Sequence, residues 1–198
     1  IDTGGIILRQ ECRIARTDTA GDLHDKLMSI GSELVVETVE GIIEKNVETR
    51  VQRSFIQGSE VLKPAPKLSR ALCHIDWNDT TTAVYNLVRG LSPYPTAFTE
   101  LVRIDGTGAA QQLKIFFGEP VTGESFESMK SRSIGGADRP GSILSDGKTF
   151  FAITTEGGAL SVSGMQLSGK KRRDVKACLA GFRNPELFTT TAGTSRAE

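Results

Sequence analysis

The chain has 198 residues, 38% of them hydrophobic, and its 24 basic and 24 acidic residues cancel to a formal net charge of zero. This length allows one or two domains with a real core, whereas the apolar runs are only a few residues long and a membrane-spanning helix needs roughly 20. We therefore expect no membrane segment. The chain opens with Ile1 rather than Met and has no secretory leader, which suggests a piece of a longer, cytoplasmic protein.

The two parts of the chain differ in charge. Residues 1–62 carry 7 basic and 11 acidic side chains, whereas residues 63–198 carry 17 and 13. A change of sign along a chain indicates two modules with different partners, and the positive module is the candidate for binding a polyanion. Cys12, Cys73 and Cys178 are widely spaced, and neither histidine has a partner at metal-ligand spacing, so we expect reduced thiols and no metal site.

The first module, residues 1–45, has the pattern of an α/β domain. Residues 5–9 are typical of a strand buried on both faces. A helix is expected over 19–43, with Thr19 as N-cap and an apolar stripe that needs a sheet to lie on. Because one short strand cannot supply that sheet, we interpret the module as a remnant of a Rossmann-like domain. Residues 46–66 end in two prolines and are expected to be an extended linker.

The second module, residues 67–188, has short strands separated by Gly-containing turns. We expect a helix over 80–90 that ends at Gly90, and strands over 97–104, 112–118, 141–145, 149–155 and 158–167. Five such strands favour a small β-barrel of the OB type, a fold that commonly binds nucleic acid. The Gly- and Ser-rich stretch 119–140 is predicted to be a long loop, and 189–198 a disordered tail.

One acidic residue occupies a turn suited to chemistry. Asp2 precedes Gly4-Gly5 and the expected strand, and ligands of open α/β sheets bind where strands meet their loops. A carboxylate there could act as a general acid or base, although an Asp beside two glycines is more often an ordinary turn residue.

Two groups of motifs resemble known enzymes. The run Ile1-Asp2-Thr3-Gly4-Gly5, followed by Thr19, Leu23, Lys26 and Leu27 in the pattern Thr-x-x-x-Leu-x-x-Lys-Leu, is similar to folate-dependent formyltransferases. Further along, Lys67-Leu68-Ser69, Ile75-Asp76-Trp77 and the segment Arg89 to Pro95 resemble the start of the C-terminal domain of methionyl-tRNA formyltransferases. Tyr94 stands where that family more often has Trp.

The resemblance implies transfer of a formyl group from 10-formyltetrahydrofolate to the amino group of methionyl initiator tRNA, without a metal. Asp2 matches the family's catalytic aspartate. The Asn and His that work with it lie on an upstream segment that this chain does not contain, so the chain alone is expected to be inactive. The same resemblance implies a tRNA-binding barrel, and we expect a monomer.

A run of four cations is the main candidate for phosphate contacts. Lys170, Lys171, Arg172 and Arg173 precede a helix expected over 175–182, whose N-terminus would add free N–H groups and a positive dipole. A solvated charged face is the alternative. Lys67, Arg70 and Arg89 are weaker candidates for the same surface. Trp77, Tyr94 and Phe98 are expected to be core residues rather than platforms for stacked bases.

Two other functions fit these patterns. A formyltransferase acting on a sugar-nucleotide amine could share both domain types. A non-catalytic RNA-binding module would use the first module only as scaffold.

Overall fold

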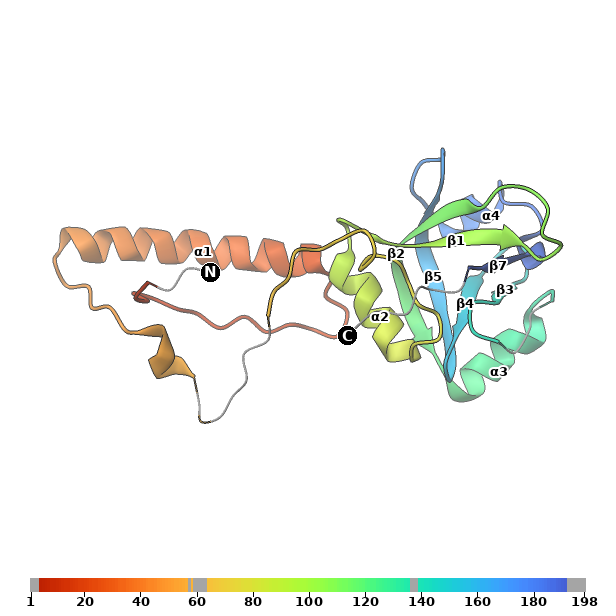
Figure 1. Ribbon diagram of the computed structural model, residues 1–198. Coiled ribbons are helices and arrows are strands. Elements are labelled where there is room, and N and C mark those ends of the chain that lie inside the picture. The colour runs from red at the N-terminus through yellow and green to blue at the C-terminus, as the bar shows by residue number, and fades with distance from the viewer. Residues whose placement is uncertain (1–3, 57, 59–63, 136–138, 192–198) are drawn as a thin grey trace. The chain divides into compact units, whose positions relative to one another are not determined.

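The computed structural model describes residues 4–56, 58, 64–135 and 139–191 (Figure 1). The chain divides into two compact units, Ile1–Lys67 and Leu68–Glu198, which are described separately.

The first unit consists mainly of one long helix. Helix α1 (Ala20–Ile43) begins after the N-cap Thr19, whose side chain accepts a hydrogen bond from the backbone of Asp22 while the Asp22 carboxylate accepts one from the Thr19 backbone. The predicted helix and cap are therefore confirmed. None of its residues is buried, and apolar side chains such as Val35 (63% exposed) and Ile43 (73%) face solvent. A short 3₁₀ helix, η1 (Gln52–Phe55), lies in the expected linker.

The strand expected over residues 5–9 is not formed. Ile6 makes one isolated antiparallel bridge with Arg50, through hydrogen bonds of 2.8 and 2.9 Å, and residues 8–10 are exposed. A strand is stabilised by ladders to its neighbours, and this bridge is the only ladder contact of the segment among the described residues. The apolar composition of residues 5–9 was therefore not sufficient to predict a strand.

The second unit is built on an antiparallel sheet. Its strands are β1 (Ala97–Arg103), β2 (Gln111–Val121), β3 (Ile143–Ser145), β4 (Phe151–Thr155), β5 (Gly158–Leu167), β6 (Arg173–Asp174) and β7 (Phe188–Thr190). The order is β3-β4-β5-β2-β1-β7, and β6 pairs with β5. The five predicted strands are confirmed.

The two ends of the sheet meet and nearly close it into a barrel. Ser142, next to β3, forms an antiparallel bridge with Thr189 of β7. Beside it the Thr190 N–H donates to the Gly141 carbonyl at 3.0 Å. Gly141 has φ 85°, and a Cβ there would lie 2.2 Å from the Thr190 hydroxyl, so only glycine fits this closure.

The barrel interior holds the main hydrophobic core. Trp77 is 2% exposed, and its indole Nε1–H donates to Thr99 Oγ1 at 3.0 Å. Helix α2 (Thr81–Leu91) buries Val84 and Val88 against the sheet, which confirms the predicted helix. It continues one residue past Gly90, and Ser92 is its C-cap.

The stretch 119–140 contains regular structure and is not one long loop. Strand β2 continues to Val121, and helix α3 (Gly123–Arg132) follows (Figure 1). Phe126 and Met129, three residues apart, pack on a small buried cluster of Leu144, Ala152 and Ala159. Residues three apart lie on the same face of a helix, so a helical conformation lets both apolar side chains reach this cluster while the polar residues face water.

The C-terminal boundaries also differ from those predicted. Thr189 and Thr190 form the end of β7 and do not belong to the tail, because they pair with β1. Helix α4 (Val175–Leu179) is shorter than the expected 175–182, and a 3₁₀ helix, η2 (Pro185–Leu187), precedes β7. The remaining tail, 192–198, lies outside the described residues.

Candidate nucleic-acid interface

Polar side chains line the outer face of the barrel where β1, β2 and β5 run side by side. Along β2, Leu113 and Ile115 are fully buried, whereas the alternating Gln112 and Lys114 are partly exposed. The register pairs Lys114 with Phe98 of β1 and with Gln166 of β5. This period of two places Gln112, Lys114 and Gln166 on one outward surface.

Three shallow hollows adjoin one another on this surface, which we call the β1–β2–β5 face. The first, about 270 Å³, is lined by Arg70, Tyr94, Gln112 and Lys114 among others. The second, about 180 Å³, shares Gln112 and Lys114 with the first and continues to Leu167. The third, about 220 Å³, shares Leu167 and is lined by Lys170, Lys171 and Arg173. The first two hollows share two side chains, Gln112 and Lys114, whereas the second and third share only the buried Leu167. We call this row of hollows the path.

The basic run forms one end of this path. All four of its residues are exposed, as both phosphate contacts and the alternative of a solvated charged face require, and a packed interior is excluded. The turn is fixed by two bonds: the Lys170 N–H donates to the Leu167 carbonyl at 3.0 Å, and Gln166 Nε2 donates to the Lys170 carbonyl at 2.7 Å. Arg173 pairs with Met165 across β6 and β5. The backbone therefore holds the cations beside the sheet while their charges face water.

Two arginine guanidinium groups lie over aromatic rings of the sheet. The Arg172 guanidinium carbon is 4.4 Å from the centroid of the Phe116 ring, and that of Arg70 is 4.7 Å from the centroid of Phe98. Cation–π attraction holds each guanidinium in place over its ring. A guanidinium held this way loses little side-chain entropy when it binds a phosphate.

The basic run precedes a helix, as predicted, but the helix is shorter than expected. Arg173 lies in strand β6, and α4, a helix of only five residues, begins after its N-cap Asp174. The Asp174 carboxylate accepts the Ala177 N–H at 2.9 Å and places a negative charge at the helix start. One of the N–H groups at the start of the helix is therefore already occupied by the Asp174 carboxylate.

The weaker predicted cations lie in different places. Arg70 joins the path, as described. Arg89 is in the last turn of α2, where its Nε–H donates to Asn86 Oδ1 at 2.8 Å, and it lines none of the three hollows. Lys67 is exposed and belongs to the first unit. Of the three, only Arg70 lines one of the hollows.

The predicted core aromatics divide in the same way. Trp77 and Phe98 are buried, as expected, whereas Tyr94 is 85% exposed and the core interpretation is wrong for it. Tyr94 stands on the turn between α2 and β1, outside the reach of the core. Lys114, Gln112 and Gln166 were not among the predicted site residues, although the alternation of polar and apolar residues along β2 marks the first two.

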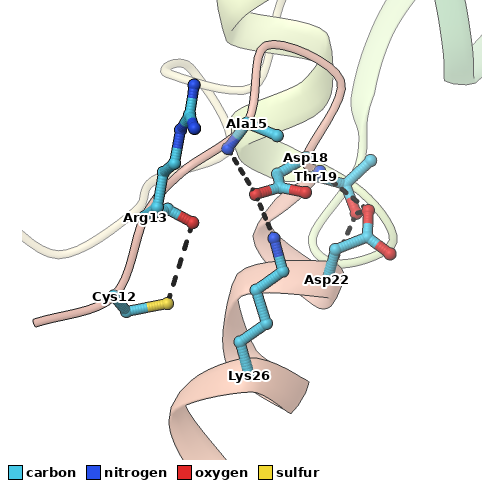
Figure 2. A network of polar contacts seen from close by, with 7 residues as sticks. All are labelled: Cys12, Arg13, Ala15, Asp18, Thr19, Asp22 and Lys26. Atoms are coloured by element: carbon cyan, nitrogen blue, oxygen red, sulfur yellow. Dashed lines mark hydrogen bonds and ion pairs between the residues drawn. The ribbon is translucent and has the colours of Figure 1, made fainter.

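Two motif residues of the first unit, Thr19 and Lys26, belong to a polar network at the start of α1. The predicted catalytic Asp2 lies outside the described residues. Near the start of α1, Lys26 Nζ donates to the Asp18 carboxylate at 2.6 Å, and the same oxygen accepts the Ala15 N–H (Figure 2). The hydrogen bond that Lys26 donates to the Asp18 carboxylate raises the pKa of Lys26, which therefore stays charged. Together with the Thr19–Asp22 cap, this network fixes the entry of the chain into the helix.

The part of the chain that the structure describes holds no group of three or more His, Cys, Asp or Glu side chains placed to bind a metal. Within the same residues, no helix combines the length and the apolar character needed to cross a bilayer.

The Cys178 thiol lines the third hollow together with Lys170, Lys171 and Arg173. Burial raises its pKa, so this sulfur is protonated near neutral pH.

Comparison with known proteins identifies the second unit. A family model described as formyl transferase, C-terminal domain, matches residues 67–183. Methionyl-tRNA formyltransferase from Phocaeicola vulgatus is 41% identical over 186 residues, which cover 94% of this chain and 53% of that protein. The enzyme of the same name from Bacteroides fragilis is 40% identical over 192 residues, or 97% and 55% of the two chains.

The chain thus spans about half the length of the curated relatives it matches. Among solved structures, HypX from Aquifex aeolicus aligns with a TM-score of 0.48 and 21% identity, covering 76% of this chain and 23% of that one. The family match extends across more than half of the chain and includes β1 to β6 and α4. This chain belongs to the formyl transferase C-terminal domain family.

Proposed function

We propose that this chain is the tRNA-holding part of a methionyl-tRNA formyltransferase. The reaction would transfer the formyl group of 10-formyltetrahydrofolate to the α-amino group of methionine on the initiator tRNA. The protein would act in the cytoplasm, as a monomer, and without a metal. The observation that carries this proposal is the identity of about 40% with relatives of that name across nearly the whole chain.

The charge of the β1–β2–β5 face supports the tRNA part of the proposal. Lys114, Lys170, Lys171 and Arg173 line one path, and the stacked Arg70 and Arg172 flank it. Phosphate neutralisation by such a row supplies affinity and orientation, which place the methionyl end without taking part in bond making. An OB-type barrel suits this role because its outer strands offer a groove for a nucleic-acid backbone.

For the first unit, we propose that it belongs to an α/β, Rossmann-like catalytic domain that carries Asp2. The long apolar stripe of α1 is exposed, with Val36 and Ile42 more than half accessible. Stripes of this kind are stabilised by packing on a sheet. Asp2 would accept a proton from the attacking amine, and an Asn and a His from the rest of that domain would polarise the formyl oxygen.

Two measurements test the proposal. In a gel shift, the 198-residue chain should retard initiator tRNA at low salt and release it as salt rises, because counterion release controls such binding. A sugar-nucleotide formyltransferase predicts no shift. In a version of the protein that carries the complete catalytic domain, Asp2→Asn should abolish formylation while tRNA affinity is kept.

The outcomes distinguish the alternatives. If the version with the complete domain binds tRNA but does not formylate it even with Asp2 intact, the protein would be a non-catalytic RNA-binding module. A formylation rate that Asp2→Asn leaves unchanged would refute the catalytic role of Asp2. Measurable formylation of methionyl-tRNA by the 198-residue chain alone would contradict our assignment of the missing Asn and His.

A further inference from the structure

We propose that the hollow beside Tyr94 receives one unstacked base of the bound RNA, with Tyr94 as its stacking platform. This inference rests on the proposed tRNA-binding function and adds to it a single-nucleotide site. The site lies at the end of the path opposite to the basic run.

The first observation is that Tyr94 is exposed to an extent that folding does not explain. Its side chain is 85% accessible, whereas Phe98, the other aromatic residue that lines this hollow, is 7% accessible. An aromatic ring left in water gains nothing from the hydrophobic effect. A ring that is exposed and also lines a hollow has one face available to a ligand.

The second observation is that the backbone around Tyr94 is fixed. Thr96 is 4% exposed, its Oγ1–H donates to the Pro93 carbonyl at 2.6 Å, and its N–H donates to the Leu91 carbonyl at 2.8 Å. Proline residues flank Tyr94 on both sides and restrict φ there. The ring is therefore presented from an ordered turn, which lowers the entropy lost when a base stacks on it.

The third observation is the composition of the hollow. Its volume of about 270 Å³ is many times the roughly 30 Å³ that one water takes in the liquid. Gln112 contributes an amide that can both donate to and accept from a base edge, and Lys114 contributes a cation. The Phe98 ring is covered by Arg70 and by His74, whose ring centroid lies 5.2 Å away, which leaves Tyr94 as the open platform.

Continuity with the basic run identifies the occupant. Gln112 and Lys114 line both this hollow and the next one along the path, which leads to Lys170. A nucleic-acid backbone on the cations can therefore place an adjacent base at Tyr94. Bases are free to stack on a protein ring only where they have left a helix, so the site would select an unpaired nucleotide.

A Pro-rich peptide is the competing occupant, since such segments dock on exposed aromatic residues. The charge favours RNA, because Arg70 and Lys114 line the hollow and further cations continue from it. Glu100, an acidic residue of strand β1, pairs in register with Gln112 and does not line the hollow.

The test uses the 198-residue chain and fluorescently labelled initiator tRNA. Because stacking of one base on an aromatic ring is worth about 1–3 kcal/mol, Tyr94→Ala should weaken binding roughly 5- to 100-fold. Tyr94→Phe keeps the ring and should bind like the parent chain. Ile134→Ala, an exposed apolar residue (56%) outside the three hollows, is the matched control and should also bind like the parent.

Two additional readouts separate stacking from a structural or electrostatic role. The salt dependence of binding should be the same for Tyr94→Ala and the parent, because no charge is lost. In Tyr94→Trp, stacking should quench the new indole emission when tRNA is added, whereas the buried Trp77 of the parent should respond little.

The results are decisive in each case. If the parent binds tRNA in a salt-dependent way but Tyr94→Ala binds equally well, the base site is refuted and the proposed function stands. If the parent does not bind tRNA, the proposed function fails and the base site fails with it. Binding of a Pro-rich peptide that requires Tyr94, without an effect of Tyr94→Ala on tRNA, would overturn the inference in favour of a peptide site.

Discussion

Removal of the cations that line the third hollow should change how tRNA affinity depends on salt. Lys170, Lys171 and Arg173 all face that hollow, and Arg173 keeps its backbone pairing with Met165 when its side chain is truncated. We therefore predict that the triple alanine variant folds normally. Arg172 is left in place because its stack on Phe116 also covers the ring.

The magnitude follows from counterion release. Each phosphate neutralised by a cation contributes about 0.9 to the slope of log affinity against log salt, so three contacts contribute about 2.7. A fourfold rise, from about 50 to about 200 mM salt, then lowers the affinity of the parent chain by about 40-fold more than that of the variant. At high salt, the tRNA affinity of the parent chain should therefore come close to that of the triple alanine variant.

Fluorescence anisotropy at four or more salt concentrations measures both slopes. The control replaces three cations that line none of the three hollows, Arg132, Arg139 and Lys148, by alanine and keeps the same net charge as the first variant. An equal loss of slope in both variants would show that only net charge matters. No loss in the first variant would refute phosphate contacts by the basic run.

Three further changes test the fold that presents this surface. Trp77→Phe removes the indole donor to the buried Thr99 hydroxyl, so the free energy of unfolding should fall by about 1–2 kcal/mol in urea titrations. Phe126→Ala removes a half-buried ring from the cluster beneath α3 and should cost about 2 kcal/mol in the same assay, whereas an unpacked loop predicts no change. Burial raises the pKa of Asp146, but hydrogen bonds from Thr149 and from three backbone N–H groups lower it by more, so the folded pKa lies below its ordinary value of 3.8. The stabilisation by this carboxylate is therefore complete above pH 3.8 and is lost as the pH falls toward the folded pKa. The Asp146→Asn variant should have a lower Tm at pH 7, and its Tm should depend less on pH in the acid range.

The sheet and the long helix could be predicted because their signals are local. Alternation of apolar and polar residues in β2 and β5, and the cap at Thr19 followed by a 3.6-residue stripe, specify these elements within a few neighbouring positions. The short strands β6 and β7 have no such pattern. Strand β7 exists because Thr190 pairs with Leu101, far away in the sequence, which a local pattern cannot indicate. Strand β6 has only two residues, too few to show an alternation.

The candidate site was only partly predictable for the same reason. Four consecutive cations are evident in any reading of the chain, and they are indeed exposed. Lys114 and Gln112 become part of the site only through the register that pairs β2 with β1 and β5. Tyr94 was misassigned because its aromatic character indicates burial, whereas its exposure is set by the turn between α2 and β1.

Hydrogen exchange of the 198-residue chain with and without initiator tRNA tests the central claim most directly. Binding on the β1–β2–β5 face predicts slower exchange in 111–116 and 166–173 and at the Tyr94 turn, with no change in α3 on the other side of the core. Protection confined to α3, or no protection at low salt, would contradict the account.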